Sequence, residues 1–264
     1  MEELFAFWLK VYAIDGARYL FGAGTVSFIL LVVFRRFSAR RKIQSRSAQP
    51  SDVRRELFYS MMTVGIYATV ALATIRLEQA GFLHYYDDWA EYPMLYNLLS
   101  LPLILVLHDA YFYWAHRLMH HRRLFRVFHA AHHKSRTPTP WAAYAFAPGE
   151  AFLMALFVPL AAFIFPVHVA VLGAFLLIMI LRNAAGHSGV EYHPQSWVDG
   201  PWDFLTSVTH HDLHHQRVRG NYGLYFTWWD RWMGTEFSDY KECFHEAVGQ
   251  KAPAPATPEP VPAR

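Results

Sequence analysis

Long apolar segments alternate with short polar segments over the first 110 residues. Apolar residues run from about 19 to 34, from 57 to 75 and from 92 to 107. Each run approaches the roughly 20 residues that a helix needs to cross the bilayer core. The pattern therefore predicts three transmembrane helices. Residues 1–15 carry apolar side chains near helical spacing, and we expect them to pack against the first span.

A fourth apolar segment, residues 151–181, is interrupted by Pro159 and Pro166. It is too long for one perpendicular crossing of a core roughly 30 Å thick, and too short for two. A helical hairpin that bends near Phe165 and Pro166 and returns to the cytoplasmic side fits this length. From residue 182 to about 248 the chain is polar and aromatic, which predicts a cap of short helices.

The composition favours a membrane over water as the solvent of the chain. Hydrophobic residues make up 54% and charged residues 17%, against roughly 25% charged in an ordinary soluble protein. The one cysteine, Cys243, excludes an intramolecular disulfide framework. We therefore predict an all-α integral membrane protein with about four transmembrane or re-entrant helices and a cytoplasmic helical cap.

The distribution of charge predicts the orientation of the spans. Residues 35–55 hold eight Lys or Arg and one Asp, whereas residues 78–91 hold no Lys or Arg. The first loop should lie in the cytoplasm and the second outside. The third span then returns to the cytoplasmic face at His108. Because the positive charge is concentrated in loops, we attribute it to membrane topology and expect no nucleic-acid partner.

Histidines are concentrated in two regions of the sequence. Seven of the sixteen lie between His108 and His133, including an HxxxH at 116–120 and an HxxHH at 129–133. A second HxxHH lies at 211–215. On a helix, residues three and four apart share a face, so these spacings are typical of imidazoles that bind a shared metal ion.

Eight histidines in these motifs exceed the ligands of one ion, and we therefore predict a dinuclear metal site on the cytoplasmic side. The chain must turn between His121 and Phe128, because His116 and His129 would lie on opposite faces of one continuous helix. The candidate ligands are His116, His120, His129, His132, His133, His211, His214 and His215, with His187 of the NAAGHSG segment as a ninth.

Other polar residues near the motifs have less certain roles. On a straight helix Asp109 lies within about 20° of His116, so we expect it to orient a ligating imidazole. Tyr113, one turn before His116, is within reach of the metals. It stays open whether His108, His193 or His210 binds metal. We interpret the remaining candidates as structural, turn or packing residues: His84, His168, His245, Asn221, Tyr222, Trp229 and Asp230.

The ligand pattern favours iron among the metals considered. The chain lacks the HExxH motif of zinc hydrolases, and haem needs one axial histidine per face rather than clusters. An all-nitrogen dinuclear site beside apolar spans suits iron that activates dioxygen against an unactivated C–H bond of a lipid. A histidine-rich membrane protein that stores or transports metal without redox catalysis is the alternative. Transport would favour ionisable residues inside the spans, which are nearly free of them.

The motifs resemble those of the fatty acid hydroxylase and sterol desaturase superfamily. The resemblance covers residues 107–237 and includes the boxes HRLMH, HAAHH and HHDLHH in order. DAYFYWAHR precedes the first box, TPTPWAAYAF follows the second, and HSG lies at 187–189. The segment NYGLYFTWWDRWMGT looks especially like methylsterol oxidases and sterol desaturases. We expect a membrane region at 1–100, a catalytic domain at 101–248 and a disordered Pro/Ala-rich tail at 249–264.

The resemblance implies a membrane di-iron oxygenase. The eight box histidines and His187 would hold two irons, and O2 would be the oxidant. Electrons would arrive from a reductase through a small redox carrier. The product would be a hydroxylated or desaturated lipid, with a sterol, hopanoid, carotenoid or fatty acyl substrate. Relatives commonly carry a histidine immediately before the Pro of the AFAP segment, where this chain has Ala147.

Overall fold

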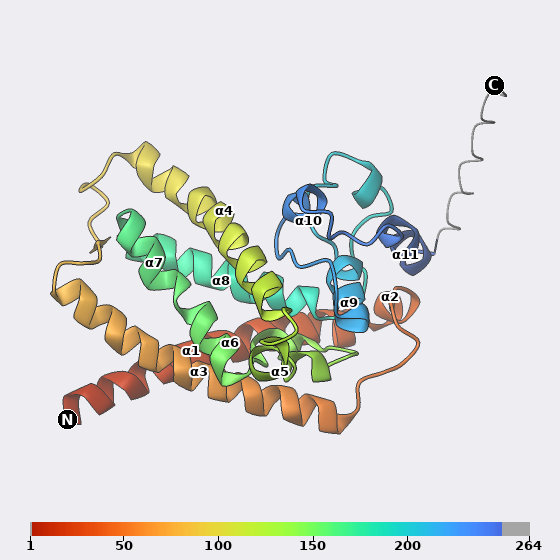
Figure 1. The fold of residues 1–264 in the computed structure, drawn as a ribbon, viewed down its shortest axis with the longest axis horizontal. Helices are drawn as coiled ribbons and strands as arrows, with labels where there is room; N and C mark the ends of the chain where they lie inside the picture. The colour runs from red at the N-terminus through yellow and green to blue at the C-terminus, as the bar shows by residue number, and fades with distance from the viewer. Residues whose placement is uncertain (1, 250–264) are drawn as a thin grey trace.

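The protein is mostly helical in its computed structural model, which describes residues 2–249. Long helices form one end of the molecule and short helices gather at the other (Figure 1). Two strands of two residues each are the exception within the described chain. Apart from Gly249, the expected disordered tail lies outside the described residues.

Four helices of the described chain are long and apolar enough to cross a membrane. They are α1 (Glu2–Phe28, continued by a π-helical turn at Ile29–Val33), α3 (Pro50–Gln79), α4 (Met94–Met119) and α8 (Val169–Gly186). The predicted spans are confirmed as helices, but each of the first three extends beyond its apolar run, because hydropathy marks the lipid-facing part of a helix rather than its ends. The expectation that residues 1–15 pack against the first span was wrong, because residues 2–15 belong to the same continuous helix.

The start of α3 follows directly from its sequence. Pro50 occupies the first helical position, where the missing N–H costs nothing. The backbone N–H of Gln49 donates to Asp52 Oδ2 at 3.0 Å, which closes a capping box. The short α2 (Arg35–Arg40) lies in the basic loop between α1 and α3.

The predicted hairpin is present, and its bend lies at the expected residues. α6 (Pro148–Ala155) and α7 (Phe157–Ile164) run out, the chain turns at residues 165–168, and α8 returns. Pro159 cannot donate a backbone hydrogen bond to Ala155, which accounts for the break between α6 and α7. The strand β2 (Val167–His168) in the turn pairs with β1 (Tyr85–Tyr86), so the tip reaches the loop between α3 and α4.

The polar C-terminal quarter folds into short helices, as predicted, and we call this group of helices the cap. It contains a 3-10 turn (Trp197–Asp199), α9 (Val208–Arg217), α10 (Trp228–Trp232) and α11 (Tyr240–Ala247). These elements lie beyond the C-terminal end of α8 (Figure 1). A small core of buried side chains holds the cap together: Val198, Leu213, Tyr240, Phe244 and Val248.

Helix α1 packs directly on the part of the chain that carries the histidines. Tyr19 of α1 stacks on Tyr144 of a 3-10 turn (Pro140–Tyr144), with ring centroids 5.6 Å apart. Gly22 faces Ile180 of α8, where a Cβ atom would lie only 2.9 Å from Ile180 Cγ1. Glycine thus permits the close approach of α1 to α8. This contact fixes the position of α8 along α1. As a result, Asn183 and His187 at the C-terminal end of α8 lie next to the cap.

Candidate metal centre

Nine histidines meet at the ends of α4 and α8 that face the cap, and they form two groups. The five-histidine group consists of His116, His120, His129, His133 and His214. The four-histidine group consists of His132, His187, His211 and His215. Within each group the candidate ligand atoms lie within 4.8 Å of one another. All nine candidates named from the sequence are brought together, and eight of the nine are buried.

The turn that this convergence requires lies close to where it was expected. α4 ends at Met119, and the chain turns through residues 120–124 before the single-turn helix α5 (Phe125–Phe128). His129 then faces back toward His116. The residues of the HAAHH motif occupy a turn and a 3-10 segment (His132–Lys134) rather than an α-helix.

Each HxxHH motif divides its histidines between the two groups. His129 and His133 join the five-histidine group, whereas His132 joins the other. In the second motif the division is reversed, because His211 and His215 join the four-histidine group and His214 the five-histidine group. On α9 this follows from helical geometry: residues four apart point the same way, but adjacent residues diverge by about 100°. The two groups are thus tied together by both motifs.

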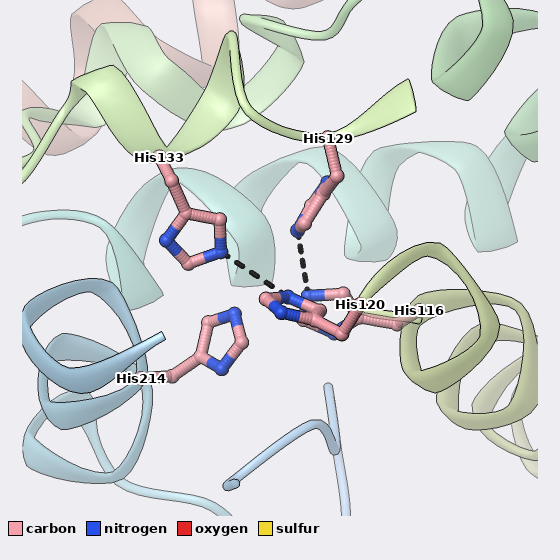
Figure 2. A group of neighbouring side chains, drawn as sticks. All are labelled: His116, His120, His129, His133 and His214. Carbon is pink, nitrogen blue, oxygen red and sulfur yellow. Dashed lines mark hydrogen bonds between the residues drawn. The ribbon is translucent and has the colours of Figure 1, made fainter. Parts of the chain in front are cut away.

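The imidazole nitrogens face one another at the separation of metal ligands. In the five-histidine group, Nε2 of His116 is 2.9 Å from Nε2 of His129, and Nε2 of His120 is 3.2 Å from Nε2 of His133 (Figure 2). In the other group, Nε2 of His187 is 3.3 Å from that of His132 and 3.0 Å from that of His211. Two nitrogens at about 2.1 Å from one ion and at right angles are about 3.0 Å apart.

Backbone carbonyls fix the tautomers of three of these imidazoles. Nδ1 of His116 donates to the carbonyl of Tyr222 at 2.9 Å, Nδ1 of His187 to that of Asn183, and Nδ1 of His214 to that of Gly220. A carbonyl only accepts, so Nδ1 carries the proton and Nε2 presents its lone pair to the centre. Nε2 of His214 is buried and has no hydrogen-bond partner among the described residues. Lone pairs gathered in this way are satisfied by a cation.

Burial also keeps the histidines neutral. Desolvation, reinforced by neighbouring histidines, lowers the pKa of His133 to about 3, and desolvation lowers the pKa of His187 to about 4. The same causes hold the pKa well below its ordinary value in five others: His129, His132, His211, His214 and His215. A neutral imidazole is the form that binds metal, so the residues present fit metal ions.

A buried carboxylate that sequence reasoning missed contacts the five-histidine group. Oε1 of Glu150 lies 2.7 Å from Nδ1 of His129, and both side chains are at most 2% exposed. Glu150 stands in the first turn of α6, after Pro148. It is outside both histidine motifs in the sequence, and the only signal was an acidic residue at the edge of an apolar segment. A carboxylate on the outer nitrogen of a ligand histidine orients the ring and raises its basicity.

The expectation that Asp109 orients a ligating imidazole was wrong. Its carboxylate accepts hydrogen bonds from the backbone N–H of Tyr225 and Phe226, and from the indole N–H of Trp228. Asp109 therefore holds the loop before α10 against α4. It shares a helix direction with His116, but the two lie almost two turns apart, about 10 Å along the axis.

Tyr113 also points away from both groups. Its hydroxyl pairs with Thr235 at 2.9 Å and accepts a hydrogen bond from Arg117 at 3.1 Å. Asp230 accepts from the backbone N–H of Tyr222 and Gly223, as a turn residue does.

The three histidines left open by the sequence lie outside both groups. Nδ1 of His108 pairs with the hydroxyl of Tyr225 at 3.0 Å, and Nδ1 of His193 lies 2.6 Å from Glu191. Nε2 of His210 is 3.5 Å from Asp230. His108 and His193 are thus engaged by other partners, whereas neither ring nitrogen of His210 has a hydrogen-bond partner among the described residues. Ala147 is buried at the N-cap of α6, where its methyl group offers no ligand atom.

A largely apolar cavity of about 360 Å³ begins beside the four-histidine group. At this end it is lined by Phe112, Phe146 and Asn183, and the ring of Phe146 is 5.4 Å from that of His132. At the other end it reaches Tyr85 and Val169, near the tip of the hairpin. The cavity thus runs along the four spanning helices and has the shape and polarity of a pocket for a long apolar molecule.

Comparisons with known proteins point to one family. The profile of the fatty acid hydroxylase family matches residues 101–235. Human lathosterol oxidase is 34% identical over 187 residues, 70% of this chain and 61% of the relative. Delta(7)-sterol 5(6)-desaturase ERG3A of Gibberella zeae is 32% identical over 223 residues, 84% of this chain and 60% of the relative. The chain thus spans about three fifths of the length of these relatives. No solved structure matches it.

Proposed function

Because the chain belongs to the fatty acid hydroxylase family, we propose that it is a membrane-bound oxidoreductase that uses two irons and O2 to hydroxylate or desaturate a lipid. The observation that carries this proposal is the meeting of nine histidines in two groups whose facing Nε2 atoms are 2.9–3.3 Å apart. Two adjacent all-nitrogen groups are the ligand set that a pair of irons needs.

The ligands would be the histidines of the two groups. His116, His120, His129, His133 and His214 would hold one iron, and His132, His187, His211 and His215 the other. When bound, the pair would supply the activation of O2 for attack on an unactivated C–H bond. The protein contributes the fixed Nδ1–H tautomers and the carboxylate of Glu150 behind His129.

The cavity supports a lipid as the substrate. Phe112 and Phe146 line it beside the histidines and keep bulk water from the reacting carbon. The names of the relatives refer to lathosterol, Δ7-sterols and, for rat methylsterol monooxygenase 1, methylsterols. A sterol is accordingly the substrate class that we propose first, with electrons supplied by a reductase or a small redox carrier.

We propose that the centre lies on the cytoplasmic side of the membrane. The basic loop of residues 35–55 lies at the histidine end of the molecule, where Nε2 of Gln44 donates to Asp212 of α9 at 3.0 Å. Positive loops remain in the cytoplasm. In a Cys243→Ser background, a membrane-impermeant thiol reagent should label a cysteine at Arg123 only after permeabilisation, and one at Asp88 in intact cells. The reverse pattern would contradict this orientation.

The function is tested by a reaction with defined components. Purified protein loaded with iron is incubated with a chemical reductant, O2 and a lipid extract, and the products are identified by mass spectrometry. Our proposal predicts an O2-dependent lipid product that carries one added oxygen or has lost two hydrogens. Metal uptake without any lipid product would favour the storage or transport alternative, and turnover without O2 would favour a hydrolase.

A further inference from the structure

The cavity has a charged pair in its wall, at a depth where the chain is surrounded by apolar helices. Nη1 of Arg18 lies 3.0 Å from Oδ1 of Asp15, and each side chain is 15% exposed. Both residues line the cavity from α1. The other charged residue of the lining, Glu78, is exposed at the far end of α3. Ionisable side chains inside a membrane span are costly; they face the interior, pair with one another as here, and mark the path of a substrate.

The pair has hydrogen-bonding capacity to spare. Nε of Arg18 is buried and has no hydrogen-bond partner among the described residues. No other ion pair involving Asp15 is found among them, and one of its carboxylate oxygens carries the contact to Arg18. Because the two charges cancel, the pair offers the free Nε–H of Arg18 and the second carboxylate oxygen of Asp15 without net charge, beside Tyr144, which contacts the guanidinium and also lines the cavity. A hydroxyl group is the complement, since it accepts and donates at the same time.

The packing of α1 against α8 gives the distance from this pair to the histidines. Gly22 faces Ile180, so Arg18, one turn earlier on α1, lies at the level of about Leu176 on α8. His187 follows three turns later on α8, on the order of 15 Å away. The cavity connects the two levels, because Asn183 lines it one turn before His187.

We propose that Asp15 and Arg18 bind the hydroxyl group of a long lipid alcohol whose apolar body fills the cavity. The inference rests on the proposed function and names the substrate class of that site. The hydroxyl donates to Asp15 and accepts from Arg18, which satisfies both charges where water is scarce. A fatty acid is the poorer ligand, because its carboxylate would place a third charge beside Asp15.

The position of the pair also sets which carbon is oxidised. With its hydroxyl at Arg18, a lipid presents to the histidines a carbon on the order of 15 Å away, which is roughly a dozen C–C bonds from the polar end of an extended chain. In a sterol, that carbon lies toward the side-chain end, which differs from the 5(6) position in the name of the Gibberella zeae relative.

The test is a binding measurement on the metal-free, full-length protein in nanodiscs. Three probes compete with tritiated lathosterol: unlabelled lathosterol, its 3-deoxy analogue and palmitate. The variant Asp15→Leu/Arg18→Met removes both charges together, so that no buried charge is left unpaired. Asp15→Asn/Arg18→Gln serves as a second variant if the first does not fold. Arg76→Met, which removes an exposed charge from α3, is the matched control.

We expect the wild-type protein to bind lathosterol about tenfold or more tightly than the deoxy analogue, as a charge-assisted hydrogen bond provides. The double variant should lose this preference and still bind the deoxy analogue, whereas Arg76→Met keeps it. Equal affinities in the wild-type protein, an unchanged preference in a folded double variant, or tighter binding of palmitate would each overturn the proposal. Because the assay needs no metal, a preference without any oxidised product would contradict the proposed function alone.

Discussion

The two HxxHH motifs have the same spacing and different backbones. HDLHH lies on α9, ten residues long, whose start is capped by Ser207 through a hydrogen bond from the N–H of His210. HAAHH lies on a turn and a 3-10 segment, held by backbone bonds as long as 3.3 Å. The regular helix needs little outside support. The irregular segment depends on contacts from elsewhere, including Glu150 behind His129.

This difference teaches that the two histidine groups are supported unequally. The four-histidine group takes His187 from the C-terminal end of α8 and two further members, His211 and His215, from α9. The five-histidine group takes two from the irregular segment, and the carbonyls that fix His116 and His214 come from the loop at residues 220–222. We therefore expect the five-histidine group to be the more sensitive to changes at a distance.

The largest loss of metal and activity should follow replacement of the one histidine in each HxxHH motif that belongs to a different group from the other two. His132→Ala should remove a ligand from the four-histidine group alone, and His214→Ala one from the five-histidine group alone. Each variant should hold one iron instead of two and reduce lipid oxidation to background, because both irons are needed. Metal analysis and product mass spectrometry measure the two quantities. His121→Ala, an exposed neighbour, should behave as wild type. Two irons retained in His132→Ala would contradict the ligand assignment.

Glu150→Gln should weaken metal binding at the five-histidine group by about 10–100-fold and leave the other group unchanged. Unlike a carboxylate, the amide cannot become negatively charged when a metal binds, and that charge would make His129 a stronger ligand. Competition with a metal-binding dye should therefore show two clearly different metal affinities in the variant, whereas the two affinities of the wild-type protein are more similar. Asp109→Asn is the contrasting variant, because that carboxylate holds backbone amides and no imidazole. Equal loss at both groups in Glu150→Gln would show that the carboxylate acts on the whole centre.

Acid should destabilise the metal-free protein. Burial lowers the pKa of His133 to about 3 and that of His187 to about 4, whereas in the unfolded chain each has a pKa of about 6.5. Below about pH 6.5 the unfolded state binds more protons than the folded state. The free energy of unfolding therefore decreases as the pH falls from 6.5 toward 4. Each histidine contributes about 1.4 kcal/mol per pH unit in that window. Thermal unfolding of metal-free protein between pH 7.5 and 5 measures the loss, and a flat profile would contradict it.

A smaller effect is expected at Asn221, which shapes the loop behind the five-histidine group. Its φ of 53° is left-handed, its side-chain amide donates to the carbonyl of His210, and its side-chain oxygen accepts from the N–H of Phe237. Asn221→Ala loses both bonds and should cost about 2–3 kcal/mol of stability. Metal should be lost from the five-histidine group before the other. Uniform loss from both groups would contradict the unequal support described above.

The histidine content of the centre was predictable because its signals are local. HxxxH and HxxHH are periodicities within a few residues, and the need for a turn after His120 follows from helix geometry alone. The bend of the hairpin at Phe165 and Pro166 was predictable for a similar reason, since proline interrupts an apolar run.

The partition of the histidines and their outer contacts was not predictable from the sequence. The role of Glu150, and of the carbonyls of Gly220 and Tyr222, depends on segments brought together by the tertiary fold. The error at Asp109 has the same origin. A helical projection shows that Asp109 and His116 point in the same direction, but not how far apart they lie along the helix axis. The Asp15–Arg18 pair was overlooked because the apolar run was expected to begin after it, at residue 19.

The central claim is that two irons occupy the two histidine groups, and anomalous X-ray diffraction at the iron edge tests it most directly. Crystals of the iron-loaded protein should show two anomalous peaks per chain. One should lie among His116, His129 and His214, and the other among His132, His187 and His211, each about 2.1 Å from the Nε2 atoms. A single peak, or peaks outside these groups, would contradict the account.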